Sequence, residues 1–412
     1  MRFALDAEQR AFAATLDRMF SAAGTPSAVR AWARGEHGPG LALWERAAQA
    51  GVFALAAPEA YGGLGPLPVD VAVACTESGR HCVPGPLVET VAVTALLVRL
   101  AEAGVAAPAR EWVPRLCAGR ARATLAAPAG GPYALDADVA DAVFVVTGTG
   151  DGPGAGAVAP AAPTAQANAP AAPRAGAVTP AAPTAEANVL AAPRAGAVTP
   201  AAPTAGADTP AAPSATAGAP VVELRLAPGH GPVLASLDPA RRLARVRPGG
   251  VLLAAGPAVQ DAAAYAAAWA ACATAAQALG VGEALLGRTI EYAGRREQFG
   301  RAIGSFQAVK HRLADTLVAL EFARPLVHGA AVALATGAGT ASAEVAAAKV
   351  AACEAADAAA RTALQVHGAI GYTAEYDLSL WIGKARALRS AWGSPQECRR
   401  KVLRQGEHIF HI

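Results

Sequence analysis

The sequence predicts a mainly α-helical protein with a small β-domain in its middle. Stretches with helical periodicity occupy both ends of the chain, the long C-terminal ones rich in alanine, and short, partly β-branched segments separated by Gly and Pro lie between Ala121 and Val246. With 412 residues the chain is too long for a single core. We therefore expect two or three domains, in the order helical, β and helical.

Residues 1–118 are expected to form an all-α domain. Asp6 can cap a first helix in which apolar residues recur at helical spacing. A second helical stretch, Leu41 to Gly51, leads into a glycine-rich turn, and more helix follows from Thr90 to about Leu116.

Residues 119–250 are expected to form a β-domain, because short β-branched runs bounded by Gly and Pro are typical of strands. The expected strand segments are Ala121–Pro128, Ala140–Gly148, Val221–Ala227 and Pro232–Val246.

A repeat interrupts this domain at 150–220. The unit G-A-V-x-P-A-A-P-T-A begins at Gly156, Gly176 and Gly196, a period of 20 residues that also occurs in solenoid proteins. A solenoid unit must bury a large apolar face, and this one offers only Ala, Pro and an occasional Val. We expect a disordered Pro/Ala tract inserted in a loop of the β-domain.

Residues 251–412 are expected to form a helix bundle, with helical sequence resuming at Val251. The helical runs are Val259–Tyr292, Phe306–Thr336, Thr340–His367 and about Pro395–Gly406, and their short connections fit packed neighbours. Ala262–Gly282 has no charge over 21 residues and is long enough to span a membrane. Because it is mostly Ala, a helix buried among other helices is the better interpretation.

Charge and cysteine content exclude several classes of function. A formal net charge of +3 is small for this length, so neither nucleic-acid binding nor attachment to an anionic membrane is expected. The 6 cysteines lack metal-ligand spacing, and the first residues carry charges where a signal peptide would be apolar. We therefore predict reduced thiols, no metal and a cytoplasmic location.

The stretch from Tyr292 to Gln307 separates two of the long helices. Gly300 and Gly304 indicate a turn there, and several arginines flank a Phe and a Gln. An arginine presents a fixed fork of donors that suits a phosphate and a flat face that stacks on rings, which a structural turn would not require.

Two motifs in this half resemble those of acyl-CoA dehydrogenases. R-E-Q-F-G followed by F-Q, from Arg296 to Gln307, is similar to that family's helix-turn-helix. Q-V-H-G-A-I-G-Y-T, from Gln365 to Thr373, is similar to its Q-x-x-G-G-x-G-[FY] loop, with Ala369 in place of the second Gly. Either block alone would be an ordinary turn, but the two in this order, about 70 residues apart, are specific.

The resemblance implies the three-part architecture predicted above and an FAD cofactor. In the family the first motif reaches the FAD of a neighbouring subunit, and the backbone of the second approaches the pyrophosphate. The residues carried over as cofactor-binding are Arg296, Gln298, Phe299, Gln307, Gln365, Gly368, Gly371, Ser394 and Gln396. The implied partners are an acyl-CoA or carrier-bound acyl thioester, an electron-accepting flavoprotein, and further subunits in a homo-oligomer or in a hetero-oligomer with a paralogue.

The family's reaction, α,β-desaturation, needs a carboxylate base for the α-proton, while the flavin takes the β-hydride. The usual position of that Glu falls on Trp392, and the alternative position on the first bundle helix falls on Ala270. Neither side chain can accept a proton. Glu375, Asp377 and His367 lie nearby in the sequence, but structural roles are expected for them. No catalytic residue is assigned.

The family's T-E-P-x-x-G-S-D segment, which borders the flavin, corresponds at best to Ala126–Gly131, without its Glu, Ser and Asp. Three hypotheses remain: a dehydrogenase with an unrecognised base, a base-lacking subunit that pairs with a base-bearing paralogue, and a flavin-dependent oxygenase or reductase that needs no carboxylate base. The two empty base positions favour the second.

Overall fold

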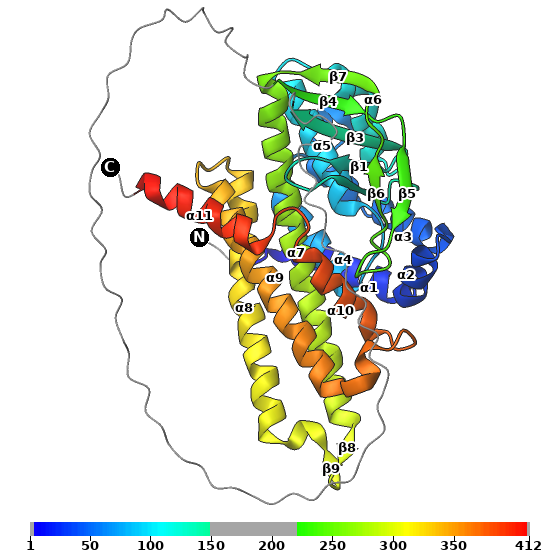
Figure 1. The fold of residues 1–412 in the computed structure, drawn as a ribbon. Coiled ribbons are helices and arrows are strands. Elements are labelled where there is room, and N and C mark those ends of the chain that lie inside the picture. The colour runs from blue at the N-terminus through cyan, green and yellow to red at the C-terminus, as the bar shows by residue number, and fades with distance from the viewer. Residues whose placement is uncertain (1–3, 149–220, 410–412) are drawn as a thin grey trace, which may run out of the picture. The chain divides into compact units, whose positions relative to one another are not determined.

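The computed structural model describes residues 4–148 and 221–409. Residues Met1–Asp151 and Pro220–Ile412 belong to one compact unit, drawn in Figure 1. The predicted repeat tract at 150–220 lies outside the described residues.

Short helices make up the N-terminal part. They are α1 (Ala7–Ser21), α2 (Thr25–Ala33), α3 (Gly38–Gln49), η1 (Val52–Ala56), η2 (Glu59–Tyr61), α4 (Pro68–Arg80), α5 (Leu87–Glu102) and α6 (Ala107–Cys117). Asp6 caps α1 as expected, because its side chain accepts from the Gln9 amide and the Gln9 side chain accepts from the Asp6 amide. The helix expected from Thr90 to Leu116 is instead two helices, since the chain turns at Gly104 with φ of 93°.

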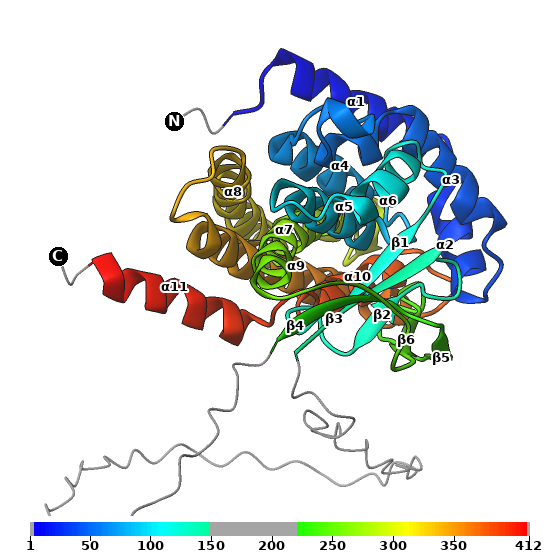
Figure 2. The same cartoon turned by 90° about the horizontal axis from the view of Figure 1, so that it is seen from above.

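The β-strands form two small sheets. The strands are β1 (Ala123–Ala126), β2 (Tyr133–Leu135), β3 (Ala142–Gly148), β4 (Val222–Leu226), β5 (His230–Leu234), β6 (Leu243–Val246) and β7 (Val251–Ala255). One sheet has the order β1-β3-β4-β7 and the other β2-β6-β5. In the view of Figure 2 the sheets lie on one side of the unit and α1 on the opposite side.

The expectation that helical sequence resumes at Val251 is wrong. Val251–Ala255 is strand β7, which pairs antiparallel with β4 along the edge of the sheet. The run is apolar and therefore ambiguous in period, but it has only 5 residues between Gly250 and Gly256, both at positive φ. The glycines separate the strand from the helix that follows.

The repeat tract begins and ends at neighbouring points of a sheet. Strands β3 and β4 pair antiparallel, and Gly148 at the end of β3 is the register partner of Val222 at the start of β4. The residues that flank the tract are therefore already held together by the ladder.

The C-terminal part is a bundle. Its elements are α7 (Pro257–Arg295), β8 (Glu297–Gln298), β9 (Arg301–Ala302), η3 (Ile303–Ser305), α8 (Gln307–Ala335), α9 (Ala341–His367), η4 (Gly368–Tyr372), α10 (Leu378–Leu388) and α11 (Pro395–Ile409). Figure 1 shows α7, α8 and α9 side by side, with the β8–β9 hairpin at the lower end and strands β1–β7 at the upper end.

Small residues let α4 and α7 approach closely. A Cβ on Gly79 would lie 2.0 Å from the Gln277 carbonyl oxygen, and a Cβ on Gly280 would lie 1.9 Å from that of Thr76. Neither position can carry a side chain without separating the helices. This explains why the bundle is rich in Ala and Gly where it meets the N-terminal helices.

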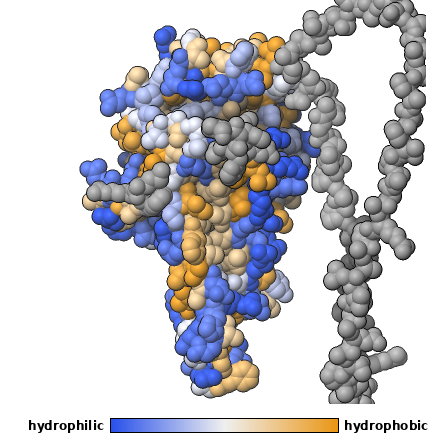
Figure 3. All heavy atoms as spheres, turned by 90° about the vertical axis from the view of Figure 1, so that its left-hand side faces the viewer, coloured by the Kyte–Doolittle hydropathy of each residue, from blue (hydrophilic) through white to orange (hydrophobic). Residues whose placement is uncertain are grey.

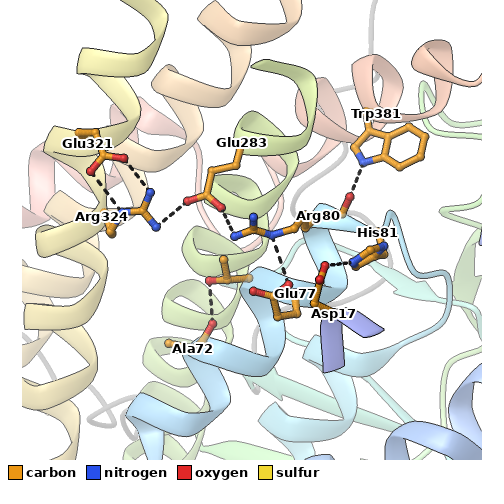
Figure 4. A network of polar contacts seen from close by, with 10 residues as sticks. Asp17, Ala72, Glu77, Arg80, His81, Glu283, Glu321, Arg324 and Trp381 are labelled. Carbon is orange, nitrogen blue, oxygen red and sulfur yellow. Dashed lines mark hydrogen bonds and ion pairs between the residues drawn. The ribbon is translucent and has the colours of Figure 1, made fainter. Parts of the chain in front are cut away.

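An ion-pair network joins the same helices (Figure 4). Arg80 on α4 lies 2.5 Å from Glu283 on α7, and Glu283 also pairs with Arg324 on α8 at 2.8 Å. Glu77 lies 3.2 Å from the Arg80 Nε. Burial raises the pKa of Glu77 to about 7, against the attraction of Arg80.

Two helices, α7 and α8, are long and apolar enough to cross a membrane by length and composition alone. In α7, 83% of the most apolar 18-residue stretch is buried inside the protein, as expected for 262–282. In α8, only 39% of the corresponding stretch is buried. The exposed apolar residues of α8 are Leu317, Val318, Phe322, Leu326 and Val332. We call them the α8 stripe, and Figure 3 shows apolar residues gathered on that side of the molecule.

Candidate functional site

The first motif forms the tip of a long helix pair. After α7 ends at Arg295, the chain turns through Phe299 and Gly300, with φ of 54° and 72°, and enters α8. The Phe299 side chain is 90% exposed and meets Phe306 edge to face, with ring centroids 6.1 Å apart. The ring is therefore accessible to another molecule.

The glycine-rich motif lies at the same end of the bundle. Helix α9 ends at His367, and Gly368 leaves the helix with φ of 67°. The His367 ring stacks on Tyr292 of α7 with centroids 4.0 Å apart, and Arg312 of α8 donates to the Gln365 side-chain oxygen. The structure thus brings together two motifs that are separate in the sequence. We call residues 292–307 with 365–372 the tip.

His367 has a structural role, as expected. Its Nδ1 lies 2.8 Å from the Ala363 carbonyl oxygen, and the ring is buried between Tyr292 and Tyr376. Burial lowers its pKa, although the bond to Ala363 opposes this. A neutral ring suits stacking on the two tyrosines.

The cations of the tip differ in their partners. Arg295 pairs with Glu291, and the Arg301 guanidinium lies 4.1 Å from the Phe306 ring centre. Arg296 is exposed, and its side chain has no hydrogen bond or ion pair within residues 4–148 and 221–409. Beside Gln365, a hollow of about 370 Å³ lies between α8 and α9, lined by Ala308, His311, Arg312, Asp315, Thr316, Ala358 and Thr362.

A tip of this kind fits a phosphate-bearing cofactor. Arg296 supplies an uncommitted fork of donors, and Gly368 leaves the backbone at a positive φ without a Cβ. Gln298 and Gln307 are exposed, and the Gln298 side chain donates to the Glu297 carbonyl at 2.7 Å. Because the tip lies at the far end of the bundle from β1–β7 (Figure 1), it faces away from this chain's own sheets.

A second region, around Trp392, is closed. Trp392 is 6% exposed and sits in a left-handed backbone conformation with φ of 55°. Its Nε1 donates to the Glu89 carboxylate on α5 at 3.2 Å. On its other side the indole lies against the turn after β1, where a Cβ on Gly130 would come within 3.0 Å of the ring.

Lys349 holds the loop that carries Trp392. This lysine of α9 is 1% exposed, and its Nζ donates to the carbonyls of Leu388 at 3.1 Å and Gly393 at 3.2 Å. It therefore satisfies carbonyls at the end of α10 that the helix itself leaves unpaired. The ammonium fixes the backbone on both sides of Trp392.

Ser394 and Gln396 belong to this second region. Ser394 caps α11, because the Glu397 amide donates to its Oγ at 3.3 Å and its own amide donates to the Glu397 carboxylate at 2.7 Å. The bonds that the Ser394 amide and hydroxyl donate to the Glu397 carboxylate lower the pKa of Glu397. Lys349 precedes Gln365 by 16 residues of α9, or about 24 Å along the helix axis. The nine predicted cofactor residues thus fall into two groups, at the tip and beside Trp392.

The other positions that were candidates for the catalytic base hold side chains that pack in the interior or form structural contacts. Ala270 is 0% exposed within α7. Asp377 pairs with Arg30 of α2 at 2.6 Å, and Arg30 also donates to the Glu375 carbonyl. These contacts tie the loop after η4 to the N-terminal helices.

Glu89 was missed by the sequence reasoning. It is 3% exposed and lines a cavity of about 280 Å³ beside Trp392. The sequence does contain a signal, because Glu89 is the single acid in the apolar run Leu87–Val98. A carboxylate buried in such a helix needs a hydrogen-bond partner, so this residue could have been predicted to have one. Its partner, Trp392, is 303 residues away in the sequence.

A buried acid lies behind this cavity. Asp136 is 0% exposed, and its Oδ1 accepts from Trp32 Nε1 at 2.9 Å. Burial raises the pKa of Asp136 to about 8, although the indole donor opposes this. Nearby, Lys384 and Asp238 form a buried ion pair at 3.3 Å.

One group in the described part of the chain has metal-like composition, namely Asp17, Glu77 and His81, whose ligand atoms lie within 4.8 Å of one another. His81 Nε2 is already 2.8 Å from Asp17, and Arg80 neutralises Glu77 (Figure 4). A cation there would meet a guanidinium, so we assign no metal to this group.

Comparison with known proteins gives consistent results. Residues 6–120 match the family model for the acyl-CoA dehydrogenase N-terminal domain, and residues 260–406 match that for the C-terminal domain. The chain is 30% identical over 379 residues to acyl-CoA dehydrogenase IpdE2 of Mycobacterium tuberculosis, covering 92% of this chain and 90% of that protein.

Solved structures share the fold. The ChsE4–ChsE5 complex from Mycobacterium tuberculosis has a TM-score of 0.70 at 22% identity, with 100% of each chain covered. A glutaryl-CoA dehydrogenase from Mycobacterium smegmatis in complex with FADH2 has a TM-score of 0.65 at 17% identity, covering 97% of this chain and 95% of that one.

Proposed function

Because the chain belongs to the acyl-CoA dehydrogenase family, we propose that it is the base-lacking subunit of an FAD-dependent hetero-oligomer that desaturates an acyl thioester. A paralogous subunit supplies the carboxylate base, and an electron-accepting flavoprotein reoxidises the cofactor. This chain supplies part of the cofactor's binding site and a surface on which the paralogue docks.

The observation that carries the proposal is the closed region around Trp392. The indole takes the place in the chain where the family's base is expected, and it is held by Glu89, Gly130 and the loop anchored by Lys349. An indole cannot accept the α-proton, and its ring packs against the turn that would border a flavin. This chain's own cleft therefore has neither a base at that position nor the family's polar flavin border.

The tip supports the other half of the proposal. FAD, when bound, supplies the hydride acceptor for the desaturation. Arg296 would pair with a phosphate of the cofactor held mainly by the paralogue, and Phe299 would cover its rings. The backbone at Gly368 and Gly371 would lie along the pyrophosphate, as the resemblance implies. The solved glutaryl-CoA dehydrogenase with FADH2 is a precedent for a flavin on this fold.

The α8 stripe supports the association of subunits. Phe322 is 73% exposed and Val318 51%, on a helix that otherwise packs against α7 and α9. Apolar side chains that follow one face of a long helix are typical of a surface covered by another protein. The ChsE4–ChsE5 complex is a precedent for two different chains of this fold in one assembly.

The test is expression of the chain alone and together with a family paralogue that carries the Glu. Flavin absorbance and reduction of an electron acceptor with acyl-CoA substrates are measured for both preparations. The chain alone should give no turnover even when loaded with FAD, because loss of a general base costs a factor of about 10²–10⁴. The co-expressed pair should be active.

A Trp392→Glu variant of the chain alone is the control. It should remain inactive, since the segment from Ala126 to Gly131 still lacks the polar border of the flavin. Robust turnover by the unaltered chain alone, abolished by Glu89→Gln or by changes at Glu375 or Asp377, would overturn the proposal and identify a relocated base.

A further inference from the structure

The cavity beside Trp392 has the features of a binding site of its own. Its volume is about 280 Å³. This lies just below the ~300–1,000 Å³ typical of small-molecule sites and is too small for a flavin together with a thioester. It is therefore suited to a fragment-sized molecule.

Its cations have no partner of their own. Arg241 and the exposed Arg386 both line it, and neither side chain makes a hydrogen bond or ion pair with any residue that the structure describes. Arg241 is partly buried, so it has lost some of its hydration. The acid that attracts it, Asp136, is held protonated near neutral pH by burial. Unpaired guanidinium groups beside a hollow favour an anionic ligand.

The other residues that line the cavity include one acid, several apolar side chains and two aromatic rings. Glu89 contributes one negative charge, and its Oε1 is already occupied by the Trp392 indole. Two arginines and one glutamate leave a net single positive charge on the wall, which one monoanion would balance. Apolar surface comes from Leu125, Leu135, Leu237 and Leu243, and aromatic surface from Tyr133 and Trp392.

We propose that this cavity binds a small organic monocarboxylate, with its carboxylate between Arg241 and Arg386 and its apolar body against the leucines and the Trp392 ring. An inorganic phosphate would use the arginines but leave the apolar wall unused, so an organic acid is favoured. The inference rests on the proposed function in one respect, namely that this chain's own cleft does not hold flavin.

Such a ligand would join two parts of the protein. Arg386 lies in the last turn of α10, before the Trp392 loop, and Arg241 precedes β6, so a carboxylate between them links the bundle to the three-stranded sheet. Binding to the folded state alone raises the thermal midpoint with ligand concentration.

The test uses the full chain, alone and with its paralogue, titrated by calorimetry with benzoate, hexanoate, inorganic phosphate and benzylamine. Benzoate or hexanoate should bind, benzylamine should not, and phosphate should bind at least tenfold more weakly. Arg241→Gln should weaken carboxylate binding by about 10-fold or more, from the loss of one charge-assisted bond. Arg386→Gln should weaken it as well. Arg247→Gln, which removes an exposed arginine directly after β6 that does not line the cavity, should leave carboxylate binding unchanged.

Failure to bind either carboxylate, equal affinity for phosphate, or unchanged affinity in both Arg241→Gln and Arg386→Gln would overturn the inference. Flavin absorbance recorded on the same samples separates the two proposals. If the chain alone binds FAD and benzoate displaces it, the cavity belongs to a flavin site and the inference fails, whereas the proposed function fails only if the chain alone turns over acyl-CoA. If neither FAD nor a carboxylate binds to the chain alone, only the inference fails.

Discussion

The tip and the Trp392 region, which hold the two groups of predicted cofactor residues, have opposite character. At the tip, an aromatic ring is 90% exposed and an arginine has no partner in the described structure. Around Trp392, the ring is 6% exposed, hydrogen-bonded to Glu89 and packed against Gly130. The residues that would serve another subunit are kept open, whereas those that would serve this chain's own chemistry are packed away.

The difference is one of energetics as well as shape. An exposed arginine and phenylalanine contribute little to folding, so substituting them should leave stability nearly unchanged. The Trp392 contacts are buried and hydrogen-bonded, so they stabilise the fold directly. The comparison therefore predicts that substitutions at the tip change cofactor retention and those around Trp392 change stability.

The largest effect is expected for Arg296→Ala. Loss of a charge-assisted bond to a phosphate costs about 1.5–3 kcal/mol, so FAD retention in the assembled oligomer should fall roughly 10- to 150-fold. The thermal midpoint should not change. Flavin stoichiometry after gel filtration measures the effect. Arg295→Ala is the matched control, because that arginine is already paired with Glu291, and equal losses in the two variants would argue against a specific role for Arg296.

A double-mutant cycle sharpens the other side of the comparison. Trp392→Phe should cost about 1–3 kcal/mol of unfolding free energy, because the buried Glu89 carboxylate loses its donor. Glu89→Leu removes that acid, so the double variant should be more stable than the sum of the two losses predicts. Urea unfolding measures the coupling. Strict additivity would show that the indole and the carboxylate do not stabilise one another.

The buried Asp136 predicts a dependence of stability on pH. Its pKa in the folded protein is about 8, against about 3.9 in an unfolded chain. Between these values the folded state binds the extra proton, so this group's contribution to stability is largest in acid and is lost as pH rises towards 8. Asp136→Asn should flatten the fall of the urea midpoint between pH 5 and 8. An identical pH profile in the variant would mean that Asp136 is ionised in the folded protein.

The smallest effect is expected at the repeat tract. Deletion of 152–219 should leave the thermal midpoint within a few degrees of the parent, because the Pro/Ala sequence has no side chains able to build a core. The pairing of Gly148 with Val222 already holds the two ends together. Differential scanning calorimetry of the deletion variant gives the answer, and a collapse of the midpoint would contradict the predicted disorder.

Sequence reasoning predicted what is local in this molecule. The Asp6 cap, the turn at Gly300 and the glycine break at Gly368 are each encoded by a few adjacent residues. Strand β7 was taken for helix because a five-residue apolar run has no readable period. Helix α10 was also not predicted, because a helix of 11 residues has only a few turns in which a period can be recognised.

The interior of the candidate site could not be predicted in the same way. The bond between Glu89 and Trp392 joins residues 303 positions apart, and Asp136 meets Trp32 across 104 positions. Such contacts depend on the packing of whole elements rather than on local pattern. The contact between the two motifs at the tip was not predicted, because they are about 70 residues apart in the sequence.

The anchor at Lys349 has a consequence for how chemistry is gained and lost on this scaffold. Since the ammonium binds the carbonyls of Leu388 and Gly393, it fixes the main chain around position 392 without touching that residue's side chain. The identity of the residue at 392 can then change while the backbone keeps its place. In an evolving lineage, a proton-accepting side chain at this position could be replaced by an indole through a change at one residue, with no remodelling of the loop. In the division of labour that we propose, such an exchange accounts for the missing base, and the loss of the polar flavin border at Ala126–Gly131 is a separate change.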